Sequence, residues 1–354
     1  MWDHDFRANQ FSNRTHPCHP YNRLITVEYK GLLGNNLAAY ATLWYYSKVL
    51  NNVEAFISPN MERNLKKVFP YISLPAFKIP HSCQKEFIPM SGDLEQERII
   101  KFFEKRNLAF VNLSGQSFAL NLFHCSKSEL LCEFRFGTEV NGMVRAFHNH
   151  LCKTNPKTHK SHSQICLLVG IHVRRTNYKK WLAMRAKQGL VDEYFFLSAM
   201  QLTLDKIEQQ SLHQLGSTDA TINMTCGDRK SPRVIFVVAS DDPSWCKDKF
   251  SQFTDLKQSG NTNLTIIYTE DYYPMVRQSG MALTTRSKWK NYTVENAHFD
   301  LAVMASMNYI IFDYGTYGFW GASLSHSKHT IGADVNTFLK DKVIEAGVEG
   351  FIFL

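Results

Sequence analysis

The feature that most constrains the fold is a mostly apolar run at residues 165–173, which ends in two adjacent arginines, Arg174 and Arg175. A β-branched run of this length is typical of a strand buried on both faces of a parallel sheet. Open α/β sheets bind their ligands at the carboxyl ends of such strands. The two guanidinium groups therefore predict a site for an anion, and their planar fork favours a phosphate. An ion-paired surface turn after a core strand is the alternative.

Strand and helix patterns alternate along the chain, which indicates a parallel α/β architecture. A strand at 25–30, a glycine turn at 31–34 and a helix at 35–50 form the first such unit. In the second half we expect strands at 165–173, 233–240, 265–268 and 308–312, and helices at 192–210 and 294–306. This order is typical of a nucleotide-binding domain.

A chain of 354 residues most naturally divides into two domains. The polar stretch at 153–160 stands just before the buried strand and has the composition of an interdomain linker. We therefore expect one domain at 20–160 and the other at 161–354. A second polar stretch, 211–232, is interpreted as a surface insertion between a helix and a strand.

Charge and composition bear on the possible partners. Hydrophobic residues at 44% and charged residues at 20% indicate a folded globular protein. The net charge of +8 allows anionic partners. A nucleic-acid interface would cluster lysine and arginine on one helix or interleave them with aromatic residues, and the sequence shows neither pattern. We therefore expect no nucleic-acid partner.

The cysteines and glycosylation signals favour the secretory pathway. The chain has eight cysteines without a Cys-x-x-Cys pair, and Cys166 within the buried run is expected to be a core thiol. Asn-x-Ser/Thr signals stand at Asn13, Asn112, Asn223, Asn263 and Asn291. No ligand spacing typical of a metal site is present, so no metal is expected. The sequence shows neither a signal peptide nor a run of about 18 apolar residues that could span a bilayer.

Polar residues follow three of the expected strands, at the edge where parallel strands end together. They are His172, Arg174 and Arg175 after the first strand, Ser240, Asp241 and Asp242 after the second, and the glycine-rich turn 315–321 after the last. The acidic residues could accept hydrogen bonds from a base or ribose, or Ser240 or Asp242 could cap a helix. The turn could hold a diphosphate through its N–H groups and the Thr316 hydroxyl, or be a tight turn among aromatic core residues. In combination, the three strand ends predict a nucleotide-diphosphate pocket.

With these residues the chain resembles the galactoside α-1,2-fucosyltransferases and, more distantly, other fucosyltransferases with a His-x-Arg-Arg motif. The matching segments are 31–36, 169–178, 236–245 and 295–322, in family order over nearly the whole chain. The resemblance implies a GT-B fold of two Rossmann-like domains that face a central cleft. It also implies inverting, metal-independent transfer of L-fucose from GDP-fucose to the 2-hydroxyl of a galactoside-terminated glycan.

The resemblance also implies roles for the parts of the chain. The domain at 20–160 would lie on the acceptor side, and the domain at 161–354 would bind GDP-fucose. One motif arginine would grip the diphosphate, and the other would support the loop or a second phosphate oxygen. The remaining donor-binding residues would be Asp241 and Asp242 near the guanosine, and Thr316, Tyr317 and Gly318 opposite the arginines.

The chemistry of transfer fits these residue types. Negative charge develops on the β-phosphate as the sugar leaves, and preorganised cationic donors such as Arg174 can stabilise that charge in place of a metal ion. By resemblance, Asn35 would touch the leaving group or the acceptor. Inversion requires a base for the acceptor proton. His172, Asp300 and Glu295 are the candidates, and the sequence does not choose among them.

Two departures from the family motifs leave a second function open. The family motifs read Gly-Arg-x-Gly-Asn-Gln and His-x-Arg-Arg-Gly-Asp, whereas this chain has Leu32 for the arginine, Asn36 for the glutamine, and Thr176 and Asn177 for Gly-Asp. Loss of an arginine that acted on the leaving group would cost about 10²–10³ in rate. The alternative to an active fucosyltransferase is therefore a GDP-sugar-binding or glycan-binding protein of the same fold.

The resemblance further implies a location. Members of this family are usually Golgi proteins held by a short N-terminal anchor. The expectation is therefore a protein of the Golgi lumen, bound to the Golgi membrane only through an anchor that this sequence does not show.

Overall fold

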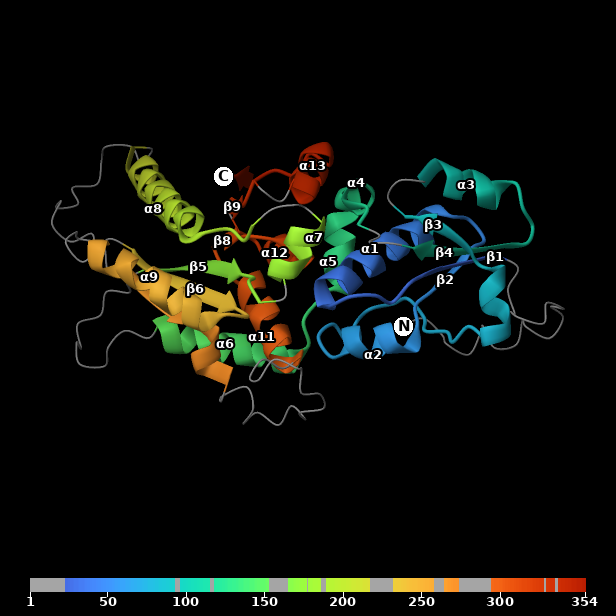
Figure 1. The fold of residues 1–354 in the computed structure, drawn as a ribbon, viewed down its shortest axis with the longest axis horizontal. Helices are drawn as coiled ribbons and strands as arrows, with labels where there is room; N and C mark the ends of the chain where they lie inside the picture. The colour runs from blue at the N-terminus through green and yellow to red at the C-terminus, as the bar shows by residue number, and fades with distance from the viewer. Residues whose placement is uncertain are drawn as a thin grey trace. The chain divides into compact units, whose positions relative to one another are not determined.

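The computed structural model (Figure 1) describes residues 23–92, 96–114, 118–152, 165–176, 178–185, 189–216, 232–257, 264–273, 294–327, 329–334 and 337–354. The chain divides into two compact units, Met1–Gly137 with Lys342–Gly347, and Thr138–Asp341 with Val348–Leu354. The linker expected at 153–160 and the domain boundary expected after residue 160 lie outside the described residues.

The first unit contains a four-stranded parallel sheet with the strand order β2-β1-β4-β3. Its strands are β1 (Arg23–Val27), β2 (Glu54–Phe56), β3 (Ile88–Ser91) and β4 (Ala109–Ser114). Its helices are α1 (Leu33–Val49), α2 (Pro59–Lys66), α3 (Gln96–Glu104), α4 (Leu120–Phe123) and α5 (Lys127–Glu133), with 3₁₀ helices at His81–Glu86 and His124–Ser126. Leu24, Phe56 and Phe110 from three neighbouring strands form a buried cluster that secures this sheet.

The second unit contains a six-stranded parallel sheet with the strand order β10-β9-β8-β5-β6-β7. Its strands are β5 (Cys166–Val173), β6 (Arg233–Ser240), β7 (Leu264–Tyr268), β8 (Tyr309–Phe312), β9 (His329–Gly332) and β10 (Phe351–Phe353). The remaining helices are α6 (Thr138–Cys152), α7 (Tyr178–Arg185), α8 (Glu193–Gly216), α9 (Pro243–Lys257), α11 (Val294–Ala305), α12 (Gly315–Leu324) and α13 (Thr337–Glu345), with a 3₁₀ helix at Thr269–Tyr272.

These two parallel sheets confirm the predicted α/β fold of the GT-B type with two Rossmann-like domains. The central cleft between the domains stays a prediction. In the second half, the four expected strands and two expected helices are present, and most of their ends lie within one residue of the expectation. The helix expected at 192–210 continues as α8 to Gly216, into the stretch interpreted as an insertion, and residues 217–231 of that stretch lie outside the described residues. The structure adds β9 and β10, which are short and carry little periodicity for a sequence-based prediction.

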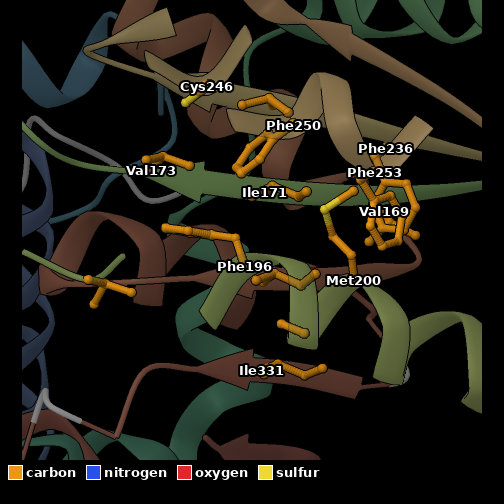
Figure 2. Close-up of a cluster of buried hydrophobic side chains, with 14 of the residues drawn as sticks. Val169, Ile171, Val173, Phe196, Met200, Phe236, Cys246, Phe250, Phe253 and Ile331 are labelled. Atoms are coloured by element: carbon orange, nitrogen blue, oxygen red, sulfur yellow. The ribbon is translucent and has the colours of Figure 1, made fainter. Parts of the chain in front are cut away.

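Strand β5, which leads to the two arginines, is buried on both faces as predicted. Val169, Ile171 and Val173 point to the face covered by α8 and α9, where Figure 2 shows them among the side chains of Phe196 and Phe250. Burial of each such side chain stabilises the fold by about 1.5–3 kcal/mol. The core therefore holds β5 rigidly where the arginines begin.

The opposite face of β5 approaches α11 closely. A Cβ atom at Gly170 would lie 2.8 Å from Sδ of Met304 in α11. A larger residue here would force the methionine side chains of this contact to shift, because real Cβ atoms do not approach other atoms so closely. Gly170 thus brings α11 down onto the strand that carries the motif.

The expectation that Cys166 is a core thiol is wrong. Cys166 forms a disulfide with Cys152 at the end of α6, with their Cα atoms 5.8 Å apart. Strand β5 begins at this residue, so the partly buried start of the strand is tied to the end of a helix. Cys83 is also disulfide-bonded, whereas Cys132 and Cys246 are free.

Within the described ranges, no helix combines the length and the apolar character that a membrane span requires.

Candidate active site

Three neighbouring strands of the second unit end at one edge of its sheet. The register pairs Val173 of β5 with Ser240 of β6, and His172 of β5 with Phe312 of β8. Because these strands are parallel, the residues that follow them emerge together. The structure therefore brings together the polar strand ends that the sequence predicted, at Arg174 and Arg175, Asp241 and Asp242, and 313–318.

Arg174 is directed toward the side of β8 and α7. Its backbone N–H donates a hydrogen bond to Oδ2 of Asp313 at 2.7 Å. Its guanidinium carbon lies 5.5 Å from the centre of the Tyr178 ring. Burial raises the pKa of Tyr178 to about 12, although the positive charge of Arg174 opposes this shift. The phenol beside Arg174 therefore stays protonated at neutral pH.

Arg175 is directed toward the side of β6, where its guanidinium group contacts other residues of the protein. Its Nη1 donates to the carbonyl oxygen of Val191 at 3.1 Å. Its guanidinium carbon lies 3.6 Å from the centre of the Trp245 ring, and its Nε lies 3.9 Å from Oδ2 of Asp242. These contacts suit the loop-supporting role that the resemblance gave to one of the two arginines.

Asp241 joins the end of β6 to the residues after β5. Its Oδ1 accepts from the backbone N–H of Arg175 at 2.8 Å, and its Oδ2 accepts from the Thr176 hydroxyl at 2.6 Å. Thr176 stands where the family motif has glycine, which could not make the second bond. The nucleotide-binding role of Asp241 stays a prediction, as does any effect of Asn177, which lies outside the described residues.

Asp242 caps helix α9. Its Oδ1 accepts from the backbone N–H of Trp245 at 3.3 Å, and Pro243 takes the first helical position. The backbone N–H of Asp242 in turn donates to Oγ of Ser240 at 2.9 Å. The capping interpretation of this segment is therefore confirmed, and a contact of Asp242 with guanosine stays a prediction.

The glycine-rich turn places the start of α12 against the strand ends. Gly315 has a φ of 79°, a conformation that favours glycine. A Cβ atom at Gly318 would lie 2.9 Å from Cβ of Phe312 and 3.0 Å from Nδ1 of His172. The side chain of the N-cap residue Tyr314 makes no capping hydrogen bond, and helix N-termini of this kind are suited to anions. Thr316 and Tyr317 lie in this first turn, where their predicted phosphate contacts remain to be tested.

His172, a candidate base, is packed into the edge of the sheet. Its ring is 6% exposed and lies 5.1 Å from the ring of Tyr317, whose hydroxyl donates to the carbonyl oxygen of Ala297. Nδ1 of His172 lies 3.6 Å from Oδ1 of Asp313. The ring is therefore enclosed by neighbouring side chains, and its role as a base stays a prediction.

The other two candidate bases lie in or at the start of α11. Asp300 is 1% exposed and accepts a hydrogen bond from the Tyr273 hydroxyl at 2.9 Å. Burial, with the charge of Asp300, raises the pKa of Tyr273 well above its usual range. The side chain of Glu295 lies outside the described residues. The role of either residue as a base stays a prediction.

Asn35 lies in the first turn of α1 and belongs to the first unit. Beside it, Leu32 is 60% exposed at the N-cap, where the family motif has an arginine. Nδ2 of Asn36 donates to the Leu32 carbonyl oxygen at 3.0 Å and so secures the turn. The predicted contact of Asn35 with donor or acceptor stays a prediction.

Sequence reasoning missed Asp313, Tyr178 and Trp245 as residues that organise the edge. Asp313 directly follows a strand and precedes a glycine turn, in the same position relative to β8 as Asp241 has to β6. That parallel could have identified it. The aromatic pair could not have been identified, since their contacts with the arginines depend on where α7 and α9 pack.

The charge of Arg174 and the helix start at α12 suit an anion at this edge, and binding of one stays a prediction. Among the described residues, no group of three or more His, Cys, Asp and Glu side chains is placed to hold a metal ion.

Comparison with known proteins places the chain in a family. The model of glycosyl transferase family 11 matches residues 5–211, which is more than half of the chain. The chain therefore belongs to this family.

Curated relatives show a consistent similarity. The chain is 23% identical over 308 residues to galactoside 2-alpha-L-fucosyltransferase SEC1 of Bos taurus, covering 86% of this chain and 66% of the relative. It is 24% identical over 312 residues to Sec1 of Mus musculus, with the same coverage. It is 24% identical over 307 residues to galactoside alpha-(1,2)-fucosyltransferase 2 of Oryctolagus cuniculus, covering 86% and 68%. The chain thus spans about two thirds of the length of these relatives.

Solved structures are similar at lower identity. A GDP-bound mutant of Arabidopsis thaliana FUT1 matches with a TM-score of 0.48 and 10% identity, covering 87% of this chain and 69% of that chain. NodZ alpha-1,6-fucosyltransferase, co-crystallised with GDP, matches with a TM-score of 0.43 and 12% identity, covering 89% and 96%.

Proposed function

We propose that this protein is a galactoside 2-α-L-fucosyltransferase, which transfers L-fucose from GDP-fucose to the 2-hydroxyl of a terminal galactoside with inversion. The observation that carries the proposal is the placement of Arg174 at the joint edge of three strands, beside the first turn of α12, where the N-cap side chain of Tyr314 makes no capping hydrogen bond. This arrangement suits a diphosphate, and the family relatives are named as galactoside fucosyltransferases.

Each part of the edge has a role in this reaction. The bond between fucose and the β-phosphate breaks, and its electron pair becomes negative charge on a phosphate oxygen. Arg174 and the first-turn N–H groups of α12 stabilise that charge without having to reorganise. Arg175 acts indirectly, because its contacts with Val191 and Trp245 hold the segment after β5 in place.

The acceptor hydroxyl must lose its proton as the new bond forms. Of the described candidates, His172 is the better base, because it lies at the strand edge itself. Asp300 lies in α11 and already accepts a hydrogen bond from Tyr273. Substitution of His172 by Gln should lower kcat by about 10²–10⁴-fold if the ring takes this proton. An unchanged kcat would assign the proton elsewhere.

The direct test is to incubate the protein with GDP-fucose and a panel of β-galactosides. The expected result is release of GDP with formation of a product fucosylated at the 2-position of galactose. The panel would also identify the acceptor. GDP binding with neither transfer nor slow hydrolysis of GDP-fucose would contradict the proposed activity.

A GDP-sugar-binding or glycan-binding protein with lost turnover is the second candidate. The exposed Leu32 favours it, because this position has no cation to offer to a ligand. Leu32→Arg should raise turnover by up to about tenfold if the missing charge limits the reaction. Leu32→Gln is the matched control, since it adds polarity without charge.

We further propose that the protein acts in the Golgi lumen. The disulfide between Cys152 and Cys166 supports an oxidising compartment. Expression with an endoplasmic-reticulum signal sequence should give a disulfide-bonded, N-glycosylated and secreted product. Efficient folding only in a reducing cytosol would contradict this location.

A further inference from the structure

Two carboxylates at the strand edge each hold the backbone of one motif arginine. Asp313, after β8, accepts from the N–H of Arg174 at 2.7 Å. Asp241, after β6, accepts from the N–H of Arg175 at 2.8 Å. Strand β5 lies between β8 and β6, so each neighbouring strand anchors one of the two arginines.

Asp313 makes its second hydrogen bond to the backbone at the start of a helix, whereas the second bond of Asp241 is to the Thr176 side chain. Oδ1 of Asp313 accepts from the backbone N–H of Tyr314 at 2.6 Å, directly before α12. The same oxygen lies 3.6 Å from Nδ1 of His172. Asp313 is 1% exposed, and a buried carboxylate is retained only when hydrogen bonds or charges compensate for its lost hydration. One buried side chain thus joins the end of β5 to the beginning of α12.

We propose that Asp313 is a positioning residue for sugar transfer. It fixes the backbone of Arg174 relative to the first turn of α12, so that the guanidinium and the helix N–H groups meet the same phosphate. This inference rests on the proposed fucosyl transfer from GDP-fucose. A displacement of about 1 Å between groups that act together costs about 10²-fold in rate, and binding of the ground state is less sensitive.

Replacement of the carboxylate by an amide should have different effects at Asp313 and at Asp241. Both hydrogen-bonding partners of Asp313 are backbone N–H groups, which can only donate. An amide has one acceptor oxygen, so its NH₂ group would face an N–H donor. One partner of Asp241 is instead the Thr176 hydroxyl, which can accept as well as donate. Asp313→Asn therefore disrupts the arrangement, whereas Asp241→Asn can keep both bonds.

The test compares Asp313→Asn with Asp334→Asn, an exposed carboxylate that pairs with Lys340 on the surface. The quantities to measure are kcat, the KM for GDP-fucose, and the Kd for GDP by calorimetry. In Asp313→Asn we expect kcat to fall by about 10²-fold and the Kd for GDP to rise by only about three- to tenfold. Asp334→Asn should match the wild type in each.

Two results would overturn the inference. One is a kcat for Asp313→Asn equal to that of Asp334→Asn. The other is a loss of GDP affinity as large as the loss of kcat, which indicates general damage to the site. If Asp313→Asn does not fold, Asp313→Ser replaces it, because the serine hydroxyl keeps one acceptor without adding an opposed NH₂ group.

A wild-type protein that makes no product would refute the proposed function alone. The Kd for GDP, measured by calorimetry, then tests whether Asp313 is a positioning residue. A Kd that rises by about three- to tenfold in Asp313→Asn, and not in Asp334→Asn, supports the positioning role. An unchanged Kd, or a rise of about 10²-fold or more, overturns it.

Discussion

The starts of α1 and α12 each carry a glycine with a positive φ, but they differ in where that glycine stands and in their surroundings. Gly31 precedes the N-cap residue Leu32, whereas Gly315 follows the N-cap residue Tyr314. Gly31 and Gly315 both have a φ of 79°, and neither N-cap residue, Leu32 or Tyr314, makes a capping hydrogen bond through its side chain. The α12 turn lies beside Arg174, whereas the α1 turn presents an exposed leucine. The comparison teaches that a positive-φ glycine and an N-cap side chain without a capping hydrogen bond occur at both helix starts. The charge of Arg174 beside α12 is what distinguishes them, and it is the basis of the anion site predicted there.

The largest expected effect is loss of the charge at the α12 turn. Arg174→Ala should abolish the thermal stabilisation that saturating GDP confers, and should lower kcat by at least about 10³-fold, because it removes the charge that would stabilise the transition state. Melting curves with and without GDP measure the first effect. Arg145→Ala, at an exposed position on α6, is the matched control. A stabilisation that survives in Arg174→Ala would show that GDP binds elsewhere.

The next effect tests how closely α12 approaches the strands. Gly318→Ala should lower the free energy of unfolding by about 1–3 kcal/mol, since its Cβ would lie 2.9 Å from Phe312. Gly142 lies within α6 with nothing near its Cβ position, so Gly142→Ala should stabilise the protein by about 0.5–1 kcal/mol. Chemical denaturation measures both. Equal effects of one sign would contradict the close approach.

A smaller effect is expected at the α1 turn. Asn36→Ala removes the hydrogen bond to the Leu32 carbonyl oxygen and should cost about 1 kcal/mol of unfolding free energy. GDP affinity should not change, because the amide serves the turn only. Asn60→Ala, at an exposed position in α2, is the control for loss of a surface amide. A large loss of GDP affinity in Asn36→Ala would extend the anion site to α1.

The last effect is confined to alkaline pH and is absent at neutral pH. The pKa of Tyr178 is raised by burial to about 12, above its usual value of 10.0. The folded state therefore keeps a proton that the unfolded state loses, and stability contributed by Tyr178 declines as pH rises from about 10 to about 12. Tyr178→Phe should reduce this decline in denaturation curves measured across that range. An identical pH dependence in the variant and the wild type would contradict the buried phenol.

Local patterns were sufficient to predict the frame of the second unit. Apolar runs predicted β5, β6 and β8, and parallel pairing of such strands necessarily brings their carboxyl ends to one edge. The cap at Asp242 was one of two readings available from the sequence, because Asp-Pro before a helix fits a cap and an acidic strand end fits a nucleotide. Its contact with Trp245 decided for the cap.

Other features could not be predicted, since they depend on distant segments. The apolar run around Cys166 predicted a core thiol, but α6 brings Cys152 close enough to form a disulfide with it. Asn112 carries a glycosylation signal, yet β4 is paired on both sides by β1 and β3, and Oδ1 of Asn112 is buried. A short sequence motif does not show which distant segments will pack against it in the folded protein.

By itself, the sequence determined the alternation of strands and helices and the adjacent arginines at a buried strand end, because both follow from the periodicity of one segment. Only the tertiary structure decided the different surroundings of those arginines. Arg175 turns to Trp245, and Arg174 lies beside Tyr178 with its backbone held by Asp313. The physical reason is that a side chain's direction depends on the charges and rings that neighbouring strands bring to it, and those come from residues far away in the chain.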